Sequence, residues 1–188
     1  MTIGILALQG GYVAHAHMLD ALSISWKYIR QVRELAEVRA LILPGGESST
    51  MLRLLRETGL FPAIQTAGQR GMPLFGTCAG AILLAKKVYA PEQDSLGMMD
   101  IAVKRNAYGR QLASCVAQGS SHLKNPMEMV FIRAPEIEIL SSEVQIIAAH
   151  EKKPVCVQQG RCLAATFHPE LGHDTTLHAY FVGLLGQV

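Results

Sequence analysis

The sequence is poor in cysteine, in aromatic residues and in net charge. Its 188 residues include four cysteines and one tryptophan, and aromatic residues make up 6% of the chain. Four cysteines are too few for a disulfide scaffold of this length, and no two of them form a C-x-x-C pair that would support a structural zinc site. We therefore expect no bound metal.

An excess of charge of one sign is also missing. The 17 Lys and Arg residues nearly balance the 15 Asp and Glu residues, which leaves a formal net charge of +2. Proteins that bind nucleic acid usually gather positive charge against the phosphate backbone. We therefore expect no nucleic-acid partner.

No hydrophobic run is long enough to cross a membrane. The apolar stretch from Ala79 to Ala85 falls far short of the ~20 residues that a bilayer span needs. The first residues, from Met1 to Leu8, lack the positively charged start of a secretory signal. These features predict a soluble, cytoplasmic protein with no membrane association.

Apolar residues are abundant, at 49% of the chain against 17% charged residues. Such a composition can build a full core and excludes a disordered chain. The sequence contains no internal repeat and no linker rich in proline or serine. Since a domain usually takes roughly 100–200 residues, we predict a single domain over residues 1–188.

Short apolar strands alternate with helical patterns in the first half of the chain. Strands are expected at Ile3–Leu8, Ile24–Ile29, Ala40–Leu43 and Pro73–Phe75. Helices are expected at Tyr12–Leu22, after an N-cap at Ser48 or Ser49, and from Ala79 to about Lys87. This alternation predicts an α/β fold, in which a mainly parallel central sheet has helices on both faces.

The second half has few helical intervals before a closing helix. That helix is expected at Asp174–Leu185, and the strand-like runs before it are Met98–Val103, Leu112–Ala117, Met129–Arg133, Val144–His150, Val155–Gln158 and Cys162–Phe167. Some of these strands are expected to join the sheet as antiparallel additions. Ligands of such sheets bind at the carboxyl ends of the strands, which here are followed by the loops after Leu8, Leu43, Phe75 and Phe167.

The sharpest local motif is Gly76-Thr77-Cys78-Ala79-Gly80, which lies between an apolar strand and an apolar helix. It is the thiol counterpart of the strand–nucleophile–helix turn, in which glycines permit a strained backbone and the nucleophile is exposed above the sheet. At a helix N-terminus the thiolate of Cys78 is favoured over the thiol, and the Ala79 N–H can face an oxyanion. The alternative interpretation of the pentapeptide alone is a small buried cysteine in a turn rich in glycine.

A thiol nucleophile needs a base, and the base needs a third group to orient it. His168-Pro169-Glu170 follows the last expected strand, so both side chains lie at a strand end. In extended chain, residues two apart point the same way, which would place Glu170 beside His168. The six remaining histidines are interpreted as structural or surface residues: His15, His17, His122, His150, His173 and His178.

The loop Pro44-Gly45-Gly46-Glu47-Ser48 offers backbone N–H donors, and we expect Gly46 and Ala79 to form the oxyanion site. An ordinary strand-to-helix turn with a serine cap would explain the same residues without catalysis. Arg105 could hold a substrate carboxylate in a bidentate grip, and Arg133 could add a second contact. The default interpretation of either arginine is a solvated surface charge, and sequence spacing does not decide between the two.

Taken together, these motifs resemble the class I (triad) glutamine amidotransferases, and within them the PdxT/SNO family of glutaminase subunits of pyridoxal 5′-phosphate synthase. The resemblance spans nearly the whole chain. Its further stretches are Ala7-Leu8-Gln9-Gly10, Arg105-Asn106, Gly109-Arg110-Gln111 and Phe131-Ile132-Arg133-Ala134-Pro135. Ile82 stands where many triad glutaminases have glutamine, as the PdxT-like pattern expects.

The resemblance implies a three-layer flavodoxin-like sandwich and a catalytic triad of Cys78, His168 and Glu170. It implies a glutamine site lined by Gly46, Glu47, Ser48, Arg105, Ile132 and Arg133. It also implies the substrate L-glutamine and a partner, the PdxS/SNZ synthase subunit, which is a TIM barrel. The partner would use the ammonia to make pyridoxal 5′-phosphate (vitamin B6), so this chain itself would need no cofactor.

The sequence departs from the family pattern at Ala14, where an acidic residue often precedes the histidine, and at Lys104, where an acid is usual. Residues His173-Asp174 also differ from the usual continuation. Two other functions fit a similar fold. One is a stand-alone thiol hydrolase of γ-glutamyl or peptide bonds, and the other is a binding subunit without catalysis.

Overall fold

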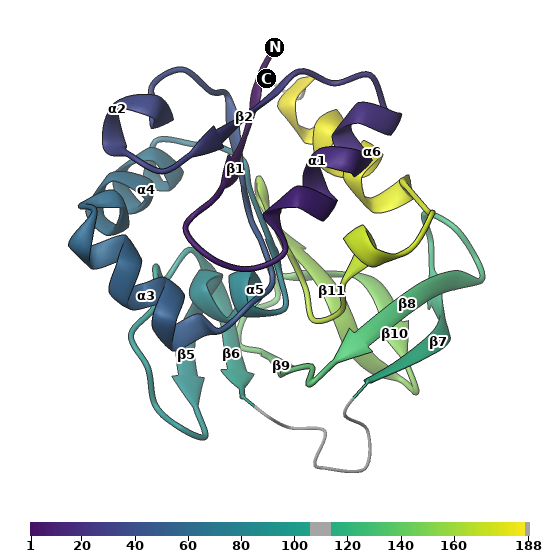
Figure 1. The fold of residues 1–188 in the computed structure, drawn as a ribbon. Coiled ribbons are helices and arrows are strands. Elements are labelled where there is room, and N and C mark those ends of the chain that lie inside the picture. The colour runs from purple at the N-terminus through teal and green to yellow at the C-terminus, as the bar shows by residue number, and fades with distance from the viewer. Residues whose placement is uncertain (106–113, 187–188) are drawn as a thin grey trace.

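A nine-stranded sheet runs through the molecule, and its first half is parallel (Figure 1). The computed structural model describes residues 1–105 and 114–186. The strand order is β2-β1-β3-β4-β12-β11-β10-β7-β8. The five strands paired in parallel are β1 (Ile3–Leu6), β2 (Trp26–Ile29), β3 (Ala40–Leu43), β4 (Leu74–Thr77) and β12 (Cys162–Ala165).

The antiparallel additions expected from the sequence are confirmed. They are β11 (Lys153–Gln159), β10 (Gln145–His150), β7 (Ser114–Ser121) and β8 (Met127–Ile132). A second, three-stranded sheet has the order β5-β6-β9, formed by β5 (Ala85–Tyr89), β6 (Met99–Lys104) and β9 (Glu136–Ile139).

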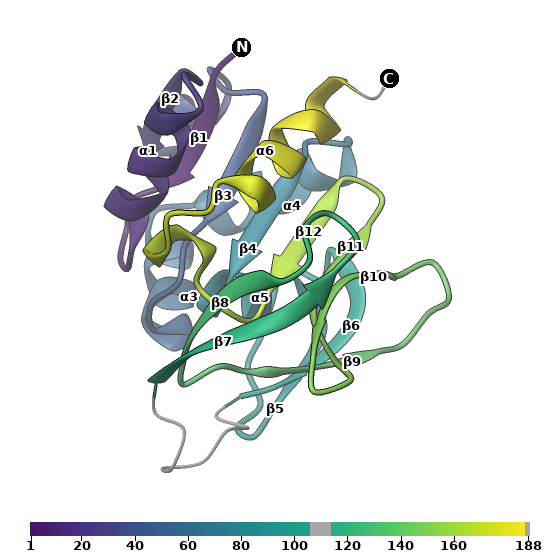
Figure 2. The ribbon, with the colours of Figure 1, turned by 90° about the vertical axis from the view of Figure 1, so that its right-hand side faces the viewer.

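Helices cover both faces of the large sheet, which gives the expected three-layer flavodoxin-like arrangement (Figures 1 and 2). One face carries α1 (Tyr12–Ala21) and α6 (Thr176–Gly183). The other carries α3 (Ser48–Glu57), α4 (Leu60–Gln69) and α5 (Ala79–Leu84). The short elements are α2 (Val32–Leu35), η2 (Pro169–Leu171) and η3 (Leu184–Gly186).

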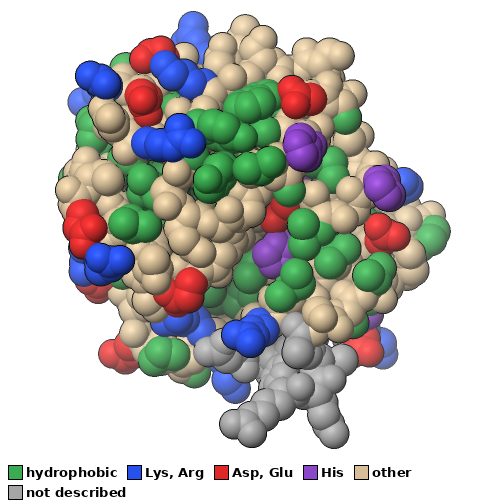
Figure 3. Space-filling model, in the orientation of Figure 1, with side chains coloured by type: hydrophobic (Ala, Val, Ile, Leu, Met, Phe, Trp, Pro, Cys, Tyr) green, Lys and Arg blue, Asp and Glu red, His purple; other side chains and the backbone are tan. Residues whose placement is uncertain are grey.

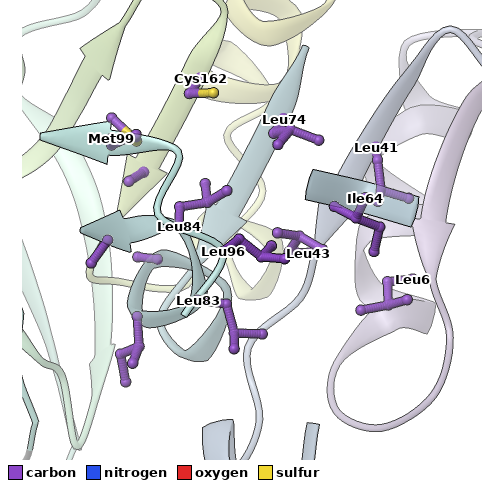
Figure 4. Packing of buried hydrophobic residues seen from close by; sticks show 14 of the residues in the cluster. Leu6, Leu41, Leu43, Ile64, Leu74, Leu83, Leu84, Leu96, Met99 and Cys162 are labelled. Carbon is purple, nitrogen blue, oxygen red and sulfur yellow. The ribbon is translucent and has the colours of Figure 1, made fainter. Parts of the chain in front are cut away.

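The alternation of side chains along each strand divides the core into two hydrophobic clusters. In β3, Leu41 and Leu43 pack into the cluster under α3, α4 and α5, whereas Ala40 and Ile42 pack into the cluster under α1 and α6. Strands buried on both faces are therefore apolar at every position, as expected for a covered parallel sheet. Figure 4 shows part of the first cluster, in which Leu41 of β3 lies beside Ile64 of α4, and Leu83 and Leu84 of α5 lie nearer to β5 and β6.

Several predicted boundaries are wrong. The helix expected to reach Lys87 ends at Leu84, because Ala85–Tyr89 pairs with β6 as a strand with buried Val88 and exposed Lys86. The strand expected at Cys162–Phe167 ends at Ala165. Part of the strand predicted at Leu112–Ala117 lies outside the described residues, and β7 continues to Ser121. The sequence patterns did not reveal α2, α4 and β9.

Within the described ranges, no helix combines the length and apolar character that a bilayer crossing requires. The same residues contain no group of three or more His, Cys, Asp or Glu side chains arranged to hold a metal ion.

Glycine lets α5 lie directly against the strands that precede it. A Cβ on Gly80 would lie 1.9 Å from the carbonyl oxygen of Leu43, and one on Gly76 would lie 2.4 Å from the carbonyl carbon of Gly80. Both neighbours are backbone atoms and cannot swing aside. The glycines therefore fix how closely the helix after Cys78 approaches the sheet.

Replacing Gly80 with alanine is expected to lower the free energy of unfolding by about 2–3 kcal/mol, as overpacking of a closed core does. Gly183 of α6 is the control, because a Cβ there meets no atom within 4 Å. Urea denaturation followed by circular dichroism compares Gly80→Ala and Gly183→Ala with the natural chain. Equal midpoints for all three proteins would show that the close approach at Gly80 is not needed.

Candidate active site

Three loops meet where β3, β4 and β12 end. Cys78 follows β4 directly, His168 follows β12 after a short connection, and Gly45 and Gly46 lie in the loop after β3. A Cβ on Gly45 would lie 2.3 Å from His168 Cε1 and 3.4 Å from Cys78 Cβ. Gly45 therefore has to be glycine for these side chains to come together.

The connection from β12 to His168 consists of Thr166 and Phe167, which are both buried. Thr166 N–H donates to the Val155 carbonyl at 2.8 Å, and His168 N–H donates to the Val130 carbonyl at 2.8 Å. These backbone bonds hold the segment against β11 and β8, and so fix the position of the imidazole.

The Cys78 backbone is strained, as the sequence motif predicts. Its φ of 46° and ψ of −100° lie outside the regions that residues with a side chain usually adopt. Cys78 N–H donates to the Ala165 carbonyl at 2.8 Å, and Cys78 is the N-cap of α5. The residue is buried, and its Sγ lies 3.9 Å from the Ile132 carbonyl oxygen. The turn thus presents the sulfur to the space between β4, β8 and β12.

His168 pairs with Glu170 as expected, with 2.8 Å between His168 Nδ1 and Glu170 Oε1. Burial by itself lowers the pKa of His168, but hydrogen bonds with Cys78 and Glu170 outweigh it and raise the pKa to about 10. Burial by itself raises the pKa of Glu170, but the neighbouring His15 and His168 lower it overall. The carboxylate therefore stays ionised and orients the imidazole through Nδ1, which leaves Nε2 for Cys78.

The backbone between the two side chains differs from the prediction. An extended segment was expected, but Pro169–Leu171 forms the 3-10 turn η2, in which Leu171 N–H donates to the His168 carbonyl at 3.2 Å. The fixed φ of Pro169 suits the first position of a helical turn. The pairing of His168 with Glu170 is thus confirmed, whereas the extended geometry is wrong.

The loop after β3 is held by the loop after β1. Gly11 N–H donates to the Gly45 carbonyl at 2.9 Å, and Glu47 N–H donates to Gln9 Oε1 at 3.0 Å. Gln9 belongs to a stretch that resembles the family, but its role as a support of this loop was not predicted. Gly46 lies between these two anchored peptides, beside the Gln9 side chain.

The serine cap expected for α3 is wrong. Glu47 is the N-cap, and its carboxylate accepts from Ser49 N–H at 3.1 Å and from Thr50 N–H at 2.6 Å. Burial by itself raises the pKa of Glu47, but these hydrogen bonds lower it to about 2. The carboxylate takes the two backbone donors on separate oxygens, Ser49 N–H on Oε1 and Thr50 N–H on Oε2, whereas the Ser48 hydroxyl is directed to Gln93.

Arg105 is a partner of this loop and not a solvated surface charge. Its Nη2 lies 3.2 Å from Glu47 Oε1 and donates to Ser49 Oγ at 3.0 Å. The Arg105 side chain is 13% exposed, against 51% for Glu47. Ser48 is buried, and its hydroxyl donates to Gln93 Oε1 at 2.9 Å. The structure therefore brings Arg105, Glu47 and Ser48 to one place.

Ile132 is the last residue of β8 and Arg133 follows it, and the Ile132 carbonyl oxygen is the one that the Cys78 sulfur approaches. Arg133 has a φ of 45°, a second strained position beside the site. The stretches Asn106 and Gly109-Arg110-Gln111, which carry part of the family resemblance, lie outside the described residues. On the face that Figure 3 shows, hydrophobic side chains border a recess near the centre, in which a histidine and an acidic side chain are visible.

Two histidines interpreted as structural or surface residues lie directly behind Glu170. His15 and His178 are both fully buried, and His15 Nε2 lies 3.6 Å from Glu170 Oε1. The sequence carries no signal for this contact, because only the packing of α1 and α6 brings the two residues together.

Comparison with known proteins agrees with this geometry. The sequence profile of the SNO glutamine amidotransferase family matches residues 5–186. The chain is 44% identical over 189 residues to the pyridoxal 5′-phosphate synthase subunit PdxT of Kosmotoga olearia, and the match covers 97% of this chain and 96% of that protein. It is 46% identical over 186 residues to the PdxT subunit of Thermus thermophilus, with 98% and 97% covered.

Solved structures give the same result. A crystal structure of a glutamine amidotransferase is 43% identical, has a TM-score of 0.93 and is matched over 98% of both chains. A glutamine amidotransferase from Thermotoga maritima is 16% identical with a TM-score of 0.62, over 97% of this chain and 83% of that one, and that likeness concerns the fold alone. The family profile and the full-length relatives together establish that the chain belongs to the SNO glutamine amidotransferase family.

Proposed function

We propose that this chain hydrolyses L-glutamine to L-glutamate and ammonia, and delivers the ammonia to a synthase subunit that makes pyridoxal 5′-phosphate. The observation that carries the proposal is the Cys78, His168 and Glu170 arrangement in a chain whose full-length relatives are PdxT subunits. We extend the activity to residues 1–188 as one glutaminase domain, because the relatives match along nearly the whole chain.

Cys78, in its thiolate form, attacks the side-chain amide carbon of glutamine. His168 gives the proton on Nε2 to the departing nitrogen, and ammonia leaves as the γ-glutamyl thioester forms. His168 then takes a proton from water, whose oxygen attacks the thioester carbon. Glutamate departs and the Cys78 sulfur is regenerated, so one water is consumed for each ammonia released.

The negative charge of each tetrahedral intermediate needs donors, and we assign this role to the N–H groups of Gly46 and Ala79. Such a donor typically contributes about 3–4 kcal/mol to transition-state stabilisation. Gly46 lies in the loop that Gln9 and Gly11 support, and Ala79 is the first residue of α5. Both peptides follow a strand that ends at the site.

We assign recognition of the amino-acid end of glutamine to Glu47, Ser48, Arg105, Ile132 and Arg133. Arg105 supplies a positive charge for the α-carboxylate, and the ionised Glu47 supplies a negative charge for the α-ammonium group. Two opposite charges side by side suit the zwitterionic amino-acid end of glutamine. They discriminate against amides that lack this pair of charged groups.

The steps above use only side chains and backbone groups of this chain, so we propose no cofactor and no metal for it. The proposed partner is a synthase subunit of the PdxS/SNZ type. We place the reaction in the cytoplasm, where thiols stay reduced, because the mechanism needs Cys78 as a free thiol.

Cys78→Ala is expected to lower glutamate release by at least about a thousandfold, because no other group can form the thioester. The fold should persist, since the change removes one heavy atom from a small side chain. Cys115→Ala is the control, because Cys115 is a free cysteine on β7. A glutamate-release assay with circular dichroism of each variant provides the measurement, and full activity in Cys78→Ala would exclude the proposed nucleophile.

Glu170→Gln is expected to move the alkaline limb of the pH profile of kcat/KM to lower pH. The natural carboxylate favours the protonated imidazole, so its loss lowers the pKa of His168 from about 10. His168 then loses its proton, and its function as an acid, at lower pH. Glu57→Gln on the exposed face of α3 should leave the limb unchanged. An unmoved limb in Glu170→Gln would contradict the assigned pairing.

The isolated chain is expected to release glutamate slowly, and a PdxS-type subunit should accelerate it, because ammonia released into water is lost to the synthase. Glutamate release with and without the synthase subunit measures the effect. Equal turnover in both assays would refute the coupling and favour a stand-alone thiol hydrolase, which a panel of γ-glutamyl substrates would identify.

A further inference from the structure

A series of buried polar groups leads to Glu170 Oε1, the same carboxylate oxygen that His168 contacts. His15 Nδ1 lies 2.9 Å from His178 Nε2, and His15 Nε2 lies 3.1 Å from Thr77 Oγ1. The Thr77 hydroxyl in turn donates to Glu170 Oε1 at 3.5 Å. These groups come from α6, α1, β4 and η2, so four separate elements contribute to one series of contacts that ends at the Glu170 carboxylate.

Burial disfavours the charged form of both imidazoles in this series of contacts. Burial lowers the pKa of His15, and it lowers the pKa of His178 to about 3. The titratable groups facing Glu170 are His15 from α1 and His168 beside η2, with His178 of α6 behind His15. A neutral imidazole has one N–H and one lone pair, so the positions of the two ring hydrogens decide whether Glu170 is approached by a donor or by a lone pair.

The Glu170 carboxylate favours one placement of the hydrogens on the His15 and His178 rings. If His15 carries its hydrogen on Nε2, it donates to Thr77 Oγ1, the Thr77 hydroxyl donates to Glu170, and His178 Nε2–H donates to His15 Nδ1. His178 Nδ1, which has no partner among residues 1–105 and 114–186, then holds only a lone pair. The opposite placement would aim a His15 lone pair at the carboxylate and bury an unpaired N–H at His178, which is the costlier defect.

The N-terminus of α1 also lies beside the Glu170 carboxylate. Gly11 is the N-cap, and a Cβ on it would lie 3.7 Å from Glu170 Oε1. The first turn of α1 has no acidic residue, so the positive end of its dipole faces the carboxylate without competition. One helix therefore brings both its terminus and His15 to Glu170.

We propose that His15, fixed by His178, is a positioning residue that acts through Thr77 to hold the Glu170 carboxylate on His168. The inference rests on the proposed glutaminase function. Packing alone does not require the polar groups, because the rings also lie edge-on to Phe75, with centroids 6.2 Å away for His15 and 5.6 Å for His178. An apolar side chain could make those ring contacts.

The test compares Thr77→Val, which keeps the shape of the side chain, with Thr77→Ser, which keeps the hydroxyl. Thr77→Val is expected to lower kcat about tenfold or more with little change in KM, since it removes a hydrogen bond to a charged group. It should also move the acid limb of the pH profile to higher pH, because the less stabilised carboxylate takes up a proton more readily. Thr77→Ser should restore both values.

His15→Met and His15→Gln form the second pair, measured in the presence of the synthase subunit. His15→Met removes the donor and should reproduce Thr77→Val, whereas His15→Gln keeps a donor and should retain more activity. A merely structural role would lower kcat in all variants without moving the acid limb. If the natural chain itself releases no glutamate, the proposed function fails, which is a separate outcome.

Nitrogen-15 NMR of the imidazole rings of the natural chain tests the order of hydrogens without any variant. Nε2–H in both His15 and His178 is the expected result. Nδ1–H in His15, or an unmoved acid limb in both Thr77→Val and His15→Met, would overturn the inference.

Discussion

The parallel pairing of β4 with β12 is the constraint on which the site depends. Thr77 lies opposite Ala165 in the register, and Cys78 N–H donates to the Ala165 carbonyl at 2.8 Å. This pairing brings together two parts of the chain that lie far apart in the sequence. A nucleophile that follows one strand and a base that follows the next then share one edge of the sheet, which is where ligands of such folds bind.

Close approach of backbones completes the arrangement, because Gly45 leaves room for the His168 ring and Gly80 lets α5 touch the carbonyl of Leu43. Rigid support of this kind is what preorganised catalytic groups require.

The sequence predicted those parts of the site whose residues lie in short, recognisable motifs. Cys78 follows a strand and lies between glycines, and His168 and Glu170 flank a proline, so each could be recognised from a few residues. The alternation of apolar strands and helices likewise predicted the parallel half of the sheet. The end of α5 was missed because Ala85–Tyr89 owes its strand form to pairing with β6, a partner that local pattern does not reveal.

Contacts made only by packing could not be predicted. Glu47 caps α3 while it meets Arg105, which follows β6, and His15 meets His178 across two helices. No spacing in the sequence relates these positions. They depend on helix orientation, which the hydrophobic pattern constrains only to a face.

One sulfur among the four free cysteines, that of Cys78, is proposed as the nucleophile, and every other role at the site follows from it. The most direct test is labelling with an electrophilic glutamine analogue, followed by mass spectrometry of peptides. We expect a single adduct on Cys78, and protection by excess L-glutamine. Labelling spread over the other cysteines, or unaffected by glutamine, would contradict the assignment.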